Sequence, residues 1–190
     1  MNNRPTALFV TGPAGAGKSF FARRISMLTH QSVIDKDTMT SKIAEQMNMR
    51  LGLKSSDRES SDYLNFVRPF EYQVVLNEVK ARMGQGKSVI VDAPFLKEVT
   101  TEDWMGHMRD TFDMFDYEIL FVWMDNAADQ TRTRLEKRGL ERDQWKLDHW
   151  DEYVEDLRNA SVRYDEFDFV VTPENLEEHV VTIVDLLVDR

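Results

Sequence analysis

The fold is decided by the stretch Gly12-Pro13-Ala14-Gly15-Ala16-Gly17-Lys18-Ser19, which is a complete G-x-x-x-x-G-K-[ST] pattern. The five residues before it, Ala7-Leu8-Phe9-Val10-Thr11, form a short apolar run that favours a buried strand. After it, Phe21, Ile25 and Leu28 have the spacing of one helix face. A strand, a glycine-rich loop and a helix in this order are the context in which the pattern forms a phosphate site.

The physical chemistry of this loop indicates a nucleoside triphosphate. Glycines permit positive φ angles, so the loop can turn several N–H groups inward around an anion. The helix predicted to begin at about Gly17 adds unpaired N–H groups and the positive end of its dipole. Lys18 is then expected to reach the β- and γ-phosphates, and the Ser19 hydroxyl to be a ligand of Mg²⁺. The predicted cofactors are ATP and Mg²⁺, and the predicted nucleotide-binding residues of this region are Gly12, Pro13, Ala14, Gly15, Ala16, Gly17, Lys18, Ser19 and Phe20.

The chain has 190 residues, a net charge of −10 and no cysteine. Its length favours a single domain with a sizeable core. The lack of cysteine excludes disulfides, thiolate metal sites and a cysteine nucleophile. The negative charge argues against nucleic acid as a partner, because binding to a phosphate backbone relies on clustered Lys and Arg. The N-terminus does not resemble a signal peptide and no apolar run has the length of a membrane span, so we expect a cytoplasmic protein without membrane contact, as a monomer or small homo-oligomer.

Four more apolar runs alternate with helical patterns along the chain. The runs cover residues 32–34, 88–91, 118–124 and 167–171. Helices are predicted over residues 39–49, 62–83, 101–112, 126–138, 148–160 and from 173 onward, with Pro69 interrupting the second of them. Strands that alternate with helices imply an α/β fold in which five parallel strands are covered by helices on both faces.

Some of these segments carry predictions about packing. The helix over residues 39–49 is expected to place Ile43 and Met47 on one side. The apolar face of the helix over residues 62–83 is predicted to consist of Phe70, Val74, Val75, Leu76, Val79 and Met83. Residues 52–61 are predicted to be a polar loop, and residues 139–146 a polar connection.

Three carboxylates follow predicted strands, at the edge of the sheet where ligands of such folds bind. Asp92 ends an apolar run as a Walker B acid does, and is expected to hold Mg²⁺ beside Ser19, directly or through water. One of Asp35 and Asp37 can accept the proton of a substrate hydroxyl near the γ-phosphate. Either can instead cap the following helix. For Asp35 both roles stay open, and Asp37 is the predicted base.

Six basic residues gather within fifteen positions of this acidic chain: Arg132, Arg134, Lys137, Arg138, Arg142 and Lys146. Such a run is often only a solvated helix face. Here the positive excess opposes the overall charge, and phosphoryl transfer needs guanidinium groups around the charge that develops. A polar segment after a basic helix is also typical of a closing lid. An Arg-rich lid is therefore predicted over about residues 138–147.

Together these features resemble the small P-loop kinases, in particular the polynucleotide-kinase, zeta-toxin and chloramphenicol-phosphotransferase group, over essentially the whole chain. The resemblance rests on residues 12–19, Asp37, Asp92 and the basic helix that leads to Arg142. It implies one kinase domain over residues 1–190 with a three-layer P-loop NTPase fold, a strand order of 2-3-1-4-5, and a helical acceptor-site insert over about 38–84. It further implies four catalytic residues and one that lies against the adenine. The catalytic residues are Lys18, Asp37 as the base, and Arg138 and Arg142 on the phosphates; the adenine contact is Arg134.

The chain departs from the polynucleotide kinases at two places. Thr40 stands where those enzymes carry an Arg, and Ala93-Pro94-Phe95 where relatives often carry a polar run. With the net charge, these departures favour a small-molecule acceptor over nucleic acid, because an apolar rim suits a compact acceptor with an apolar part. Arg58 and Arg68 are candidate contacts for an anionic group of the acceptor, with surface or ion-pair roles as the alternative.

The predicted function is transfer of the γ-phosphoryl group of ATP–Mg²⁺ to a hydroxyl of a small molecule. A nucleotide-binding regulatory ATPase is one alternative, although no guanine-specific N-K-x-D sequence is present. A zeta-toxin-like kinase of nucleotide sugars is another. A AAA+ mechanical ATPase is disfavoured, because 190 residues leave no room for its additional helical domain.

Overall fold

The structure, a computed structural model, describes residues 4–159 and 162–188. Its five strands pair in parallel in the order β2-β3-β1-β4-β5. They are β1 (Thr6–Thr11), β2 (Ser32–Asp35), β3 (Val89–Asp92), β4 (Glu118–Met124) and β5 (Phe169–Val171). The predicted fold class and strand order are confirmed.

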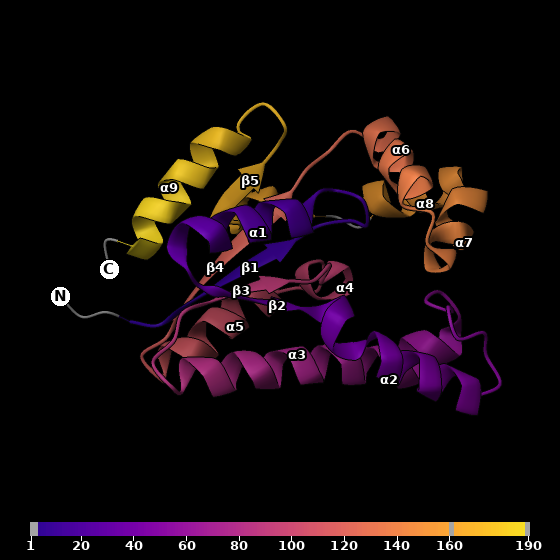
Figure 1. The fold of residues 1–190 in the computed structure, drawn as a ribbon, viewed down its shortest axis with the longest axis horizontal. Helices are drawn as coiled ribbons and strands as arrows, with labels where there is room; N and C mark the ends of the chain where they lie inside the picture. Colours follow the sequence, from indigo (N-terminus) through magenta and orange to yellow (C-terminus); the bar gives the residue numbers. More distant parts are fainter. Residues whose placement is uncertain (1–3, 160–161, 189–190) are drawn as a thin grey trace.

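Helices cover both faces of this sheet (Figure 1). The α-helices are α1 (Lys18–Thr29), α2 (Lys36–Arg50), α3 (Arg68–Met83), α4 (Leu96–Val99), α5 (Trp104–Asp113), α6 (Ala128–Arg138), α7 (Gln144–Asp148), α8 (Trp150–Asn159) and α9 (Leu176–Val188). A π-helix, η1 (Tyr63–Val67), precedes α3, and two 3₁₀ turns are η2 (Glu141–Asp143) and η3 (Tyr164–Glu166). Helices α1 and α9 pack together on one face, and α3 and α5 cover the other (Figure 1).

The core follows from the alternation of side chains along the buried strands. In β1, Ala7 and Phe9 belong to the apolar cluster under α3 and α5, while Leu8 and Val10 belong to the cluster under α1 and α9. All four side chains are fully buried, as expected of a central parallel strand covered on both faces. This central strand ends at Thr11, so the P-loop begins at the carboxyl end of a strand that is buried along its whole length.

The segment over residues 62–83 differs from its prediction. It is a π-helix followed by α3, and Pro69 lies in the first turn of α3, where proline is tolerated. Phe70 and Val74, predicted to face the core, are exposed. Tyr72 is buried in their place, together with Val75. The reason is the helix face: Tyr72, Val75, Val79 and Met83 form the stripe of α3 that joins the apolar cluster on this side of the sheet, and Phe70 and Val74 lie off that stripe.

Three other local predictions are corrected. Ile43 is exposed, because α2 turns Thr40, Ala44 and Asn48 inward instead. Residues 139–146 are not a plain connection, since η2 and the beginning of α7 lie within them. The helix predicted over residues 101–112 begins only at Trp104, and α4 precedes it. Ala160, the predicted end of the helix that begins near residue 148, lies outside the described residues.

Candidate active site

The P-loop joins β1 to α1 and has the backbone geometry that its glycines predict. Gly12, Gly15 and Gly17 have φ angles of 127°, 79° and 100°, and Gly17 is the N-cap of α1. At Gly12 a Cβ atom would lie 2.8 Å from the carbonyl oxygen of Met124, so a larger residue would collide with β4. The glycines are therefore required both for the turn and for the close approach of the loop to the sheet.

Lys18 begins α1 and directs its ammonium group across the P-loop. The Nζ atom donates to the carbonyl oxygens of Gly12 and Pro13 at 2.9 and 2.7 Å. Burial lowers the pKa of Lys18 from its ordinary value of 10.5 to about 8, although the carboxylates of Asp92 and Asp37 act in the opposite direction. A buried ammonium held only by carbonyl oxygens would gain a stronger partner in a phosphate oxygen.

Asp92 ends β3 beside the P-loop, and Asp35 is its register partner at the end of β2. Burial raises the pKa of Asp92, and a hydrogen bond with Ser19 partly offsets that effect. A carboxylate held among other acidic groups is stabilised by a cation. Ser19 and Asp92 therefore fit a Mg²⁺ ion, which takes few protein ligands and keeps water and phosphate oxygens. In the described part of the chain, no group of three or more His, Asp or Glu side chains could hold a metal ion by itself.

Asp35 and Asp37 have different surroundings, which separates the two roles that the sequence left open. Asp35 is the N-cap of α2, and its Oδ1 accepts the Thr38 N–H at 2.7 Å. Asp37 lies in the first turn without capping it, and its side chain is 46% exposed. Its Oδ2 lies 2.8 Å from Arg142 and its Oδ1 lies 3.2 Å from Lys36 Nζ.

These charges keep Asp37 ionised. Burial alone would raise the pKa of Asp37, but Lys36 and Arg142 more than offset it, so the pKa lies below its ordinary value. Asp37 is thus an available proton acceptor at neutral pH. Its low basicity is compatible with phosphoryl transfer, whose loose transition state requires mainly that the nucleophile be oriented.

A buried polar cluster that the sequence did not reveal lies behind Asp37. Lys36 Nζ lies 3.1 Å from Glu71 Oε1, and both side chains are almost fully buried. Thr40 Oγ1 and Tyr63 Oη donate to the two oxygens of the same carboxylate at 2.7 and 2.5 Å. Burial alone would raise the pKa of Glu71, but Lys36 and these hydrogen bonds lower it. The cluster fixes the start of α2, and with it Asp37, against α3 and η1.

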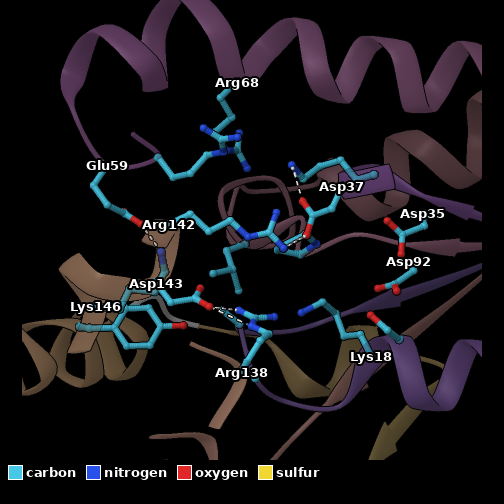
Figure 2. A pocket seen from close by; sticks show the side chains of 18 of the residues that line it. Lys18, Asp35, Asp37, Glu59, Arg68, Asp92, Arg138, Arg142, Asp143 and Lys146 are labelled. Carbon is cyan, nitrogen blue, oxygen red and sulfur yellow. Dashed lines mark hydrogen bonds and ion pairs between the residues drawn. The ribbon is translucent and has the colours of Figure 1, made fainter. Parts of the chain in front are cut away.

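The Arg-rich segment that begins at the end of α6 directs Arg138 and Arg142 into the pocket, toward Lys18 and Asp37 (Figure 2). Arg138 Nε donates to the buried carboxylate of Asp143 at 2.8 Å, and Arg142 reaches the carboxylate of Asp37. Lys146 forms an ion pair with Glu59 in the loop that follows α2. These last two pairs join the segment to the opposite wall of the cleft, and its action as a lid stays a prediction.

Two side chains, one in the connection between β4 and α6 and one on α6, contact the P-loop. Arg134 Nη1 donates to the carbonyl oxygen of Gly15 at 3.3 Å. Asn126, which the sequence analysis did not single out, donates to the carbonyl oxygen of Ala16. Arg134 thus lies at the nucleotide end of the site, and its contact with adenine stays a prediction.

A cleft of about 770 Å³ joins these groups. The predicted site residues that line it are Ala14, Gly15, Gly17, Lys18, Ser19, Phe20, Asp37, Asp92, Arg134, Arg138 and Arg142. Gly12, Pro13 and Ala16 do not line it, and contribute through the backbone of the loop. Ten basic side chains line the cleft: Lys18, Arg23, Lys36, Arg58, Arg68, Lys97, Arg134, Arg138, Arg142 and Lys146. Six acidic ones do: Asp35, Asp37, Glu59, Asp92, Asp143 and Asp156. The cleft is therefore positive in a chain whose net charge is −10.

The two departures from the polynucleotide kinases do not act as predicted. Thr40 is buried against Glu71 and does not line the cleft. Ala93 and Phe95 are buried in the core, because the chain turns inward at Phe95, whose φ is 50°. Of that stretch only Pro94 faces the cleft, so the apolar part of the acceptor wall comes from Pro94 and other residues, including Leu64 and Leu96.

The profile of a known protein family, AAA_33, described as an AAA domain, matches residues 8–159. The chain belongs to this AAA domain family. A search of curated protein sequences found no significant match.

Solved structures similar to this AAA domain protein include several kinases. A sugar kinase of Janibacter sp. is 19% identical with a TM-score of 0.62, over 95% of each chain. The APS kinase of Mycobacterium tuberculosis, in complex with AMPPNP and APS, is 17% identical with a TM-score of 0.58, over 97% of this chain and 98% of that one. A shikimate kinase of Bacteroides thetaiotaomicron is 17% identical with a TM-score of 0.54, over 96% and 98%. At these identities the likeness concerns the fold.

This AAA domain protein thus has the fold of small P-loop kinases, as the sequence predicted. Family and fold together support a phosphotransferase that binds a nucleotide. Among the described residues, no helix combines the length and the apolar character needed to cross a bilayer.

Proposed function

We propose that the protein transfers the γ-phosphoryl group of ATP to a hydroxyl group of a small molecule. The observation that carries this proposal is the convergence of Lys18, Asp37 and Arg142, from three separate parts of the chain, on one positive cleft. A P-loop alone would serve any nucleotide-binding protein. An ionised carboxylate facing the P-loop lysine, with an arginine from a lid beside it, is what transfer to a hydroxyl requires.

Each residue has a distinct role in the proposed reaction. Lys18 and the P-loop amides bind the phosphates, and Arg138 and Arg142 meet the negative charge that develops during transfer. Asp37 accepts the proton of the acceptor hydroxyl as its oxygen bonds to the γ-phosphorus and the bond to the bridging oxygen breaks, so ADP leaves. Ser19 and Asp92 would hold Mg²⁺, which neutralises phosphate charge.

The proposal includes a small acceptor, for two reasons. Lys18, Arg138 and Arg142 gather around the predicted phosphate site, whereas a nucleic-acid strand needs positive groups along an extended groove. The cleft walls are also partly apolar, which suits a compact organic molecule. A cytoplasmic location and a monomer or small homo-oligomer stay predictions.

The test is release of ADP that depends on an acceptor. With a panel of hydroxyl compounds, the wild-type protein should release ADP faster with an acceptor than without one, whereas a regulatory ATPase should be indifferent. Lys18→Ala should lower the rate about 100-fold or more, because it removes a charge that contacts the transferred group. Lys54→Ala, an exposed lysine outside the cleft, is the control. Wild-type turnover in Lys18→Ala would contradict the proposed site.

A further inference from the structure

The charges of the acceptor side of the cleft indicate what kind of molecule binds there, given the proposed function. We use the term acceptor half for the part of the cleft formed by Arg58, Tyr63, Leu64, Arg68, Tyr72 and Leu96. Two of these six side chains are cationic and four are apolar or aromatic. The question is which positive charge is free to bind a ligand.

Most charges at this side of the cleft already have partners. Arg68 makes two parallel hydrogen bonds of 2.7 Å to Glu98, and its guanidinium stacks on Tyr72 at 4.2 Å from the ring centre. Glu59 pairs with Lys146, and Asp37 pairs with Arg142, as described above. These pairs cancel in charge, so they leave no net attraction for an anion.

Arg58 is different. Among the described residues, it forms no ion pair, and its Nη1 donates to two carbonyl oxygens, those of Ser55 at 3.2 Å and Asp57 at 2.6 Å. The carboxylate of Asp57 is engaged elsewhere, accepting the N–H groups of Glu59 and Ser60 at 3.0 Å each. Arg58 helps to lower the pKa of the Asp57 carboxyl, so this carboxylate offsets part of its charge, but in the described part of the chain the guanidinium donates to neutral groups and forms no ion pair.

The position of Arg58 is also fixed in advance. Its guanidinium lies over the ring of Tyr63, 5.2 Å from the centre, and Tyr63 is anchored to Glu71. The loop that carries it is held by the buried amide of Asn48, whose Nδ2 donates to the carbonyl oxygens of Ser55 and Asp57. A cation that is already ordered loses little conformational entropy on binding a ligand.

Lys97 adds a second free cation on the same side. It lines the cleft after β3, its side chain is exposed, and it is in no ion pair among the residues described here. Its long side chain adds positive potential without fixed geometry, whereas the planar fork of Arg58 matches the oxygens of a carboxylate or phosphate.

We propose that the phosphoryl acceptor is a small hydroxy compound with an oxyanion group, either a carboxylate or a phosphate ester. The Arg58 guanidinium binds the oxyanion, the apolar and aromatic walls of the acceptor half contact the carbon skeleton, and the hydroxyl lies against Asp37. An anionic substrate would be repelled by a chain of net charge −10, so a local positive site is needed to attract it.

The first experiment measures anion binding with the nucleotide site filled. The protein is saturated with AMP-PNP and Mg²⁺ and then titrated in a calorimeter with inorganic sulfate, D-glycerate or 3-phosphoglycerate. We expect at least one probe to bind, with affinity reduced about 10- to 100-fold in Arg58→Ala, the range for loss of a charge-assisted hydrogen bond. Arg58→Lys keeps the charge, and its affinity for the probe should lie between those of the wild type and Arg58→Ala. Lys54→Ala removes a charge from the same loop outside the cleft and should match the wild type.

The outcomes separate this inference from the proposed function. If AMP-PNP does not bind, the proposed function is wrong. If AMP-PNP binds but no probe does, or if the probes bind Arg58→Ala as well as the wild type, the anionic acceptor is wrong and the kinase proposal stands. Carboxylate and phosphate acceptors are distinguished by a further titration under the same conditions, which shows whether D-glycerate or glycerol 3-phosphate binds more tightly.

Turnover gives a second, independent measurement. ADP release is compared for matched pairs that differ in the anionic group: D-glycerate and glycerol, gluconate and sorbitol, glycerol 3-phosphate and glycerol. For any pair that is phosphorylated, the anionic member should have the lower KM, and Arg58→Ala should raise the KM of that member alone. A neutral member used as well as its anionic partner would overturn the inference.

Discussion

The strongest physical prediction concerns the buried ion pair behind the candidate base. Replacing Glu71 by Gln keeps the shape of the side chain but removes its charge and turns one of its two acceptor oxygens into an NH2 donor. Lys36, which is only 6% exposed, would then lack its buried carboxylate partner. Its remaining ion-pair partner would be Asp37, at 3.2 Å. Breaking a buried pair by removing one partner typically costs about 3–5 kcal/mol of unfolding free energy. Because Asp37 partly compensates, we expect the lower end, about 3 kcal/mol.

A matched control lies two turns further along α3. Glu78 pairs with Arg82 at 2.6 Å, but both side chains are about one-third exposed. Exposed pairs of this kind contribute about 0–1 kcal/mol, so Glu78→Gln should change the unfolding free energy little. The two variants make the same chemical change on one helix and differ in burial.

Urea denaturation followed by circular dichroism measures the unfolding free energy of each variant. In thermal denaturation of a chain of this size, a loss of about 3 kcal/mol corresponds to a decrease of about 6–12 °C in Tm. The double substitution Lys36→Met with Glu71→Leu removes both charges and should recover part of the loss. A Glu71→Gln effect no larger than that of Glu78→Gln would refute the reasoning that burial makes this pair essential.

The same pair predicts a pH dependence. The pKa of Glu71 lies below its ordinary value of 4.5, so its contribution to stability is complete above about pH 4.5 and is lost as the pH falls through the lower folded value. Below pH 4.5 the stability of the wild type should fall more steeply than that of Glu71→Gln, as measured by denaturation across this range. Parallel curves for the two proteins would contradict the assignment.

Three further predictions concern the reaction, and a fourth concerns the predicted lid. Asp37→Asn should keep nucleotide affinity and lower kcat about 10²–10⁴-fold, and a lower Tm with unchanged kcat would instead show a structural role. Burial lowers the pKa of Lys18 to about 8, so the affinity for ATP–Mg²⁺ should be constant below pH 8 and weaken above it. Fluorescence titration of the nucleotide measures this affinity, and the Lys18→Arg variant should show no such change near pH 8. Arg142→Ala should lower kcat more than nucleotide affinity. In the wild type, amides of residues 138–147 should exchange faster without nucleotide than with it, and equal exchange would contradict a moving lid.

The sheet and the P-loop could be predicted because their determinants are local. An apolar run specifies a buried strand wherever it occurs, and the positive φ angles of Gly12, Gly15 and Gly17 follow from a pattern of eight residues. The order of the strands came from the resemblance to a family. The errors appear where periodicity alone decided a helix face, as in α3, where Phe70 is exposed and the polar Glu71 is buried.

What the sequence could not supply is the second partner of each contact in the site. Motif and charge patterns single out Asp37, Arg134 and the basic segment, but not the groups that hold them. Arg134 contacts a P-loop carbonyl 119 positions away, and Lys146 pairs with a residue 87 positions away. Lys36 and Glu71 are 35 positions apart, and neither belongs to a motif. A lysine between two aspartates is ordinarily assigned to solvent, so only the packing of α2 on α3 shows that it is buried.

The sequence shows single residues but not the pairs that they form, and for this reason the acceptor half was the least predictable part of the site. A P-loop binds a triphosphate mostly through backbone groups in one continuous loop, so eight residues suffice to predict the site. The acceptor half is formed by side chains from η1, α3 and the segments after α2 and β3. The kind of ligand that they favour depends on which of their charges are neutralised by ion pairs. Arg58 and Arg68 are equivalent in the sequence, yet one is paired with Glu98 and the other is not. Only the folded chain shows this difference in pairing between the two arginines, and it is the basis of our proposal that the acceptor is anionic.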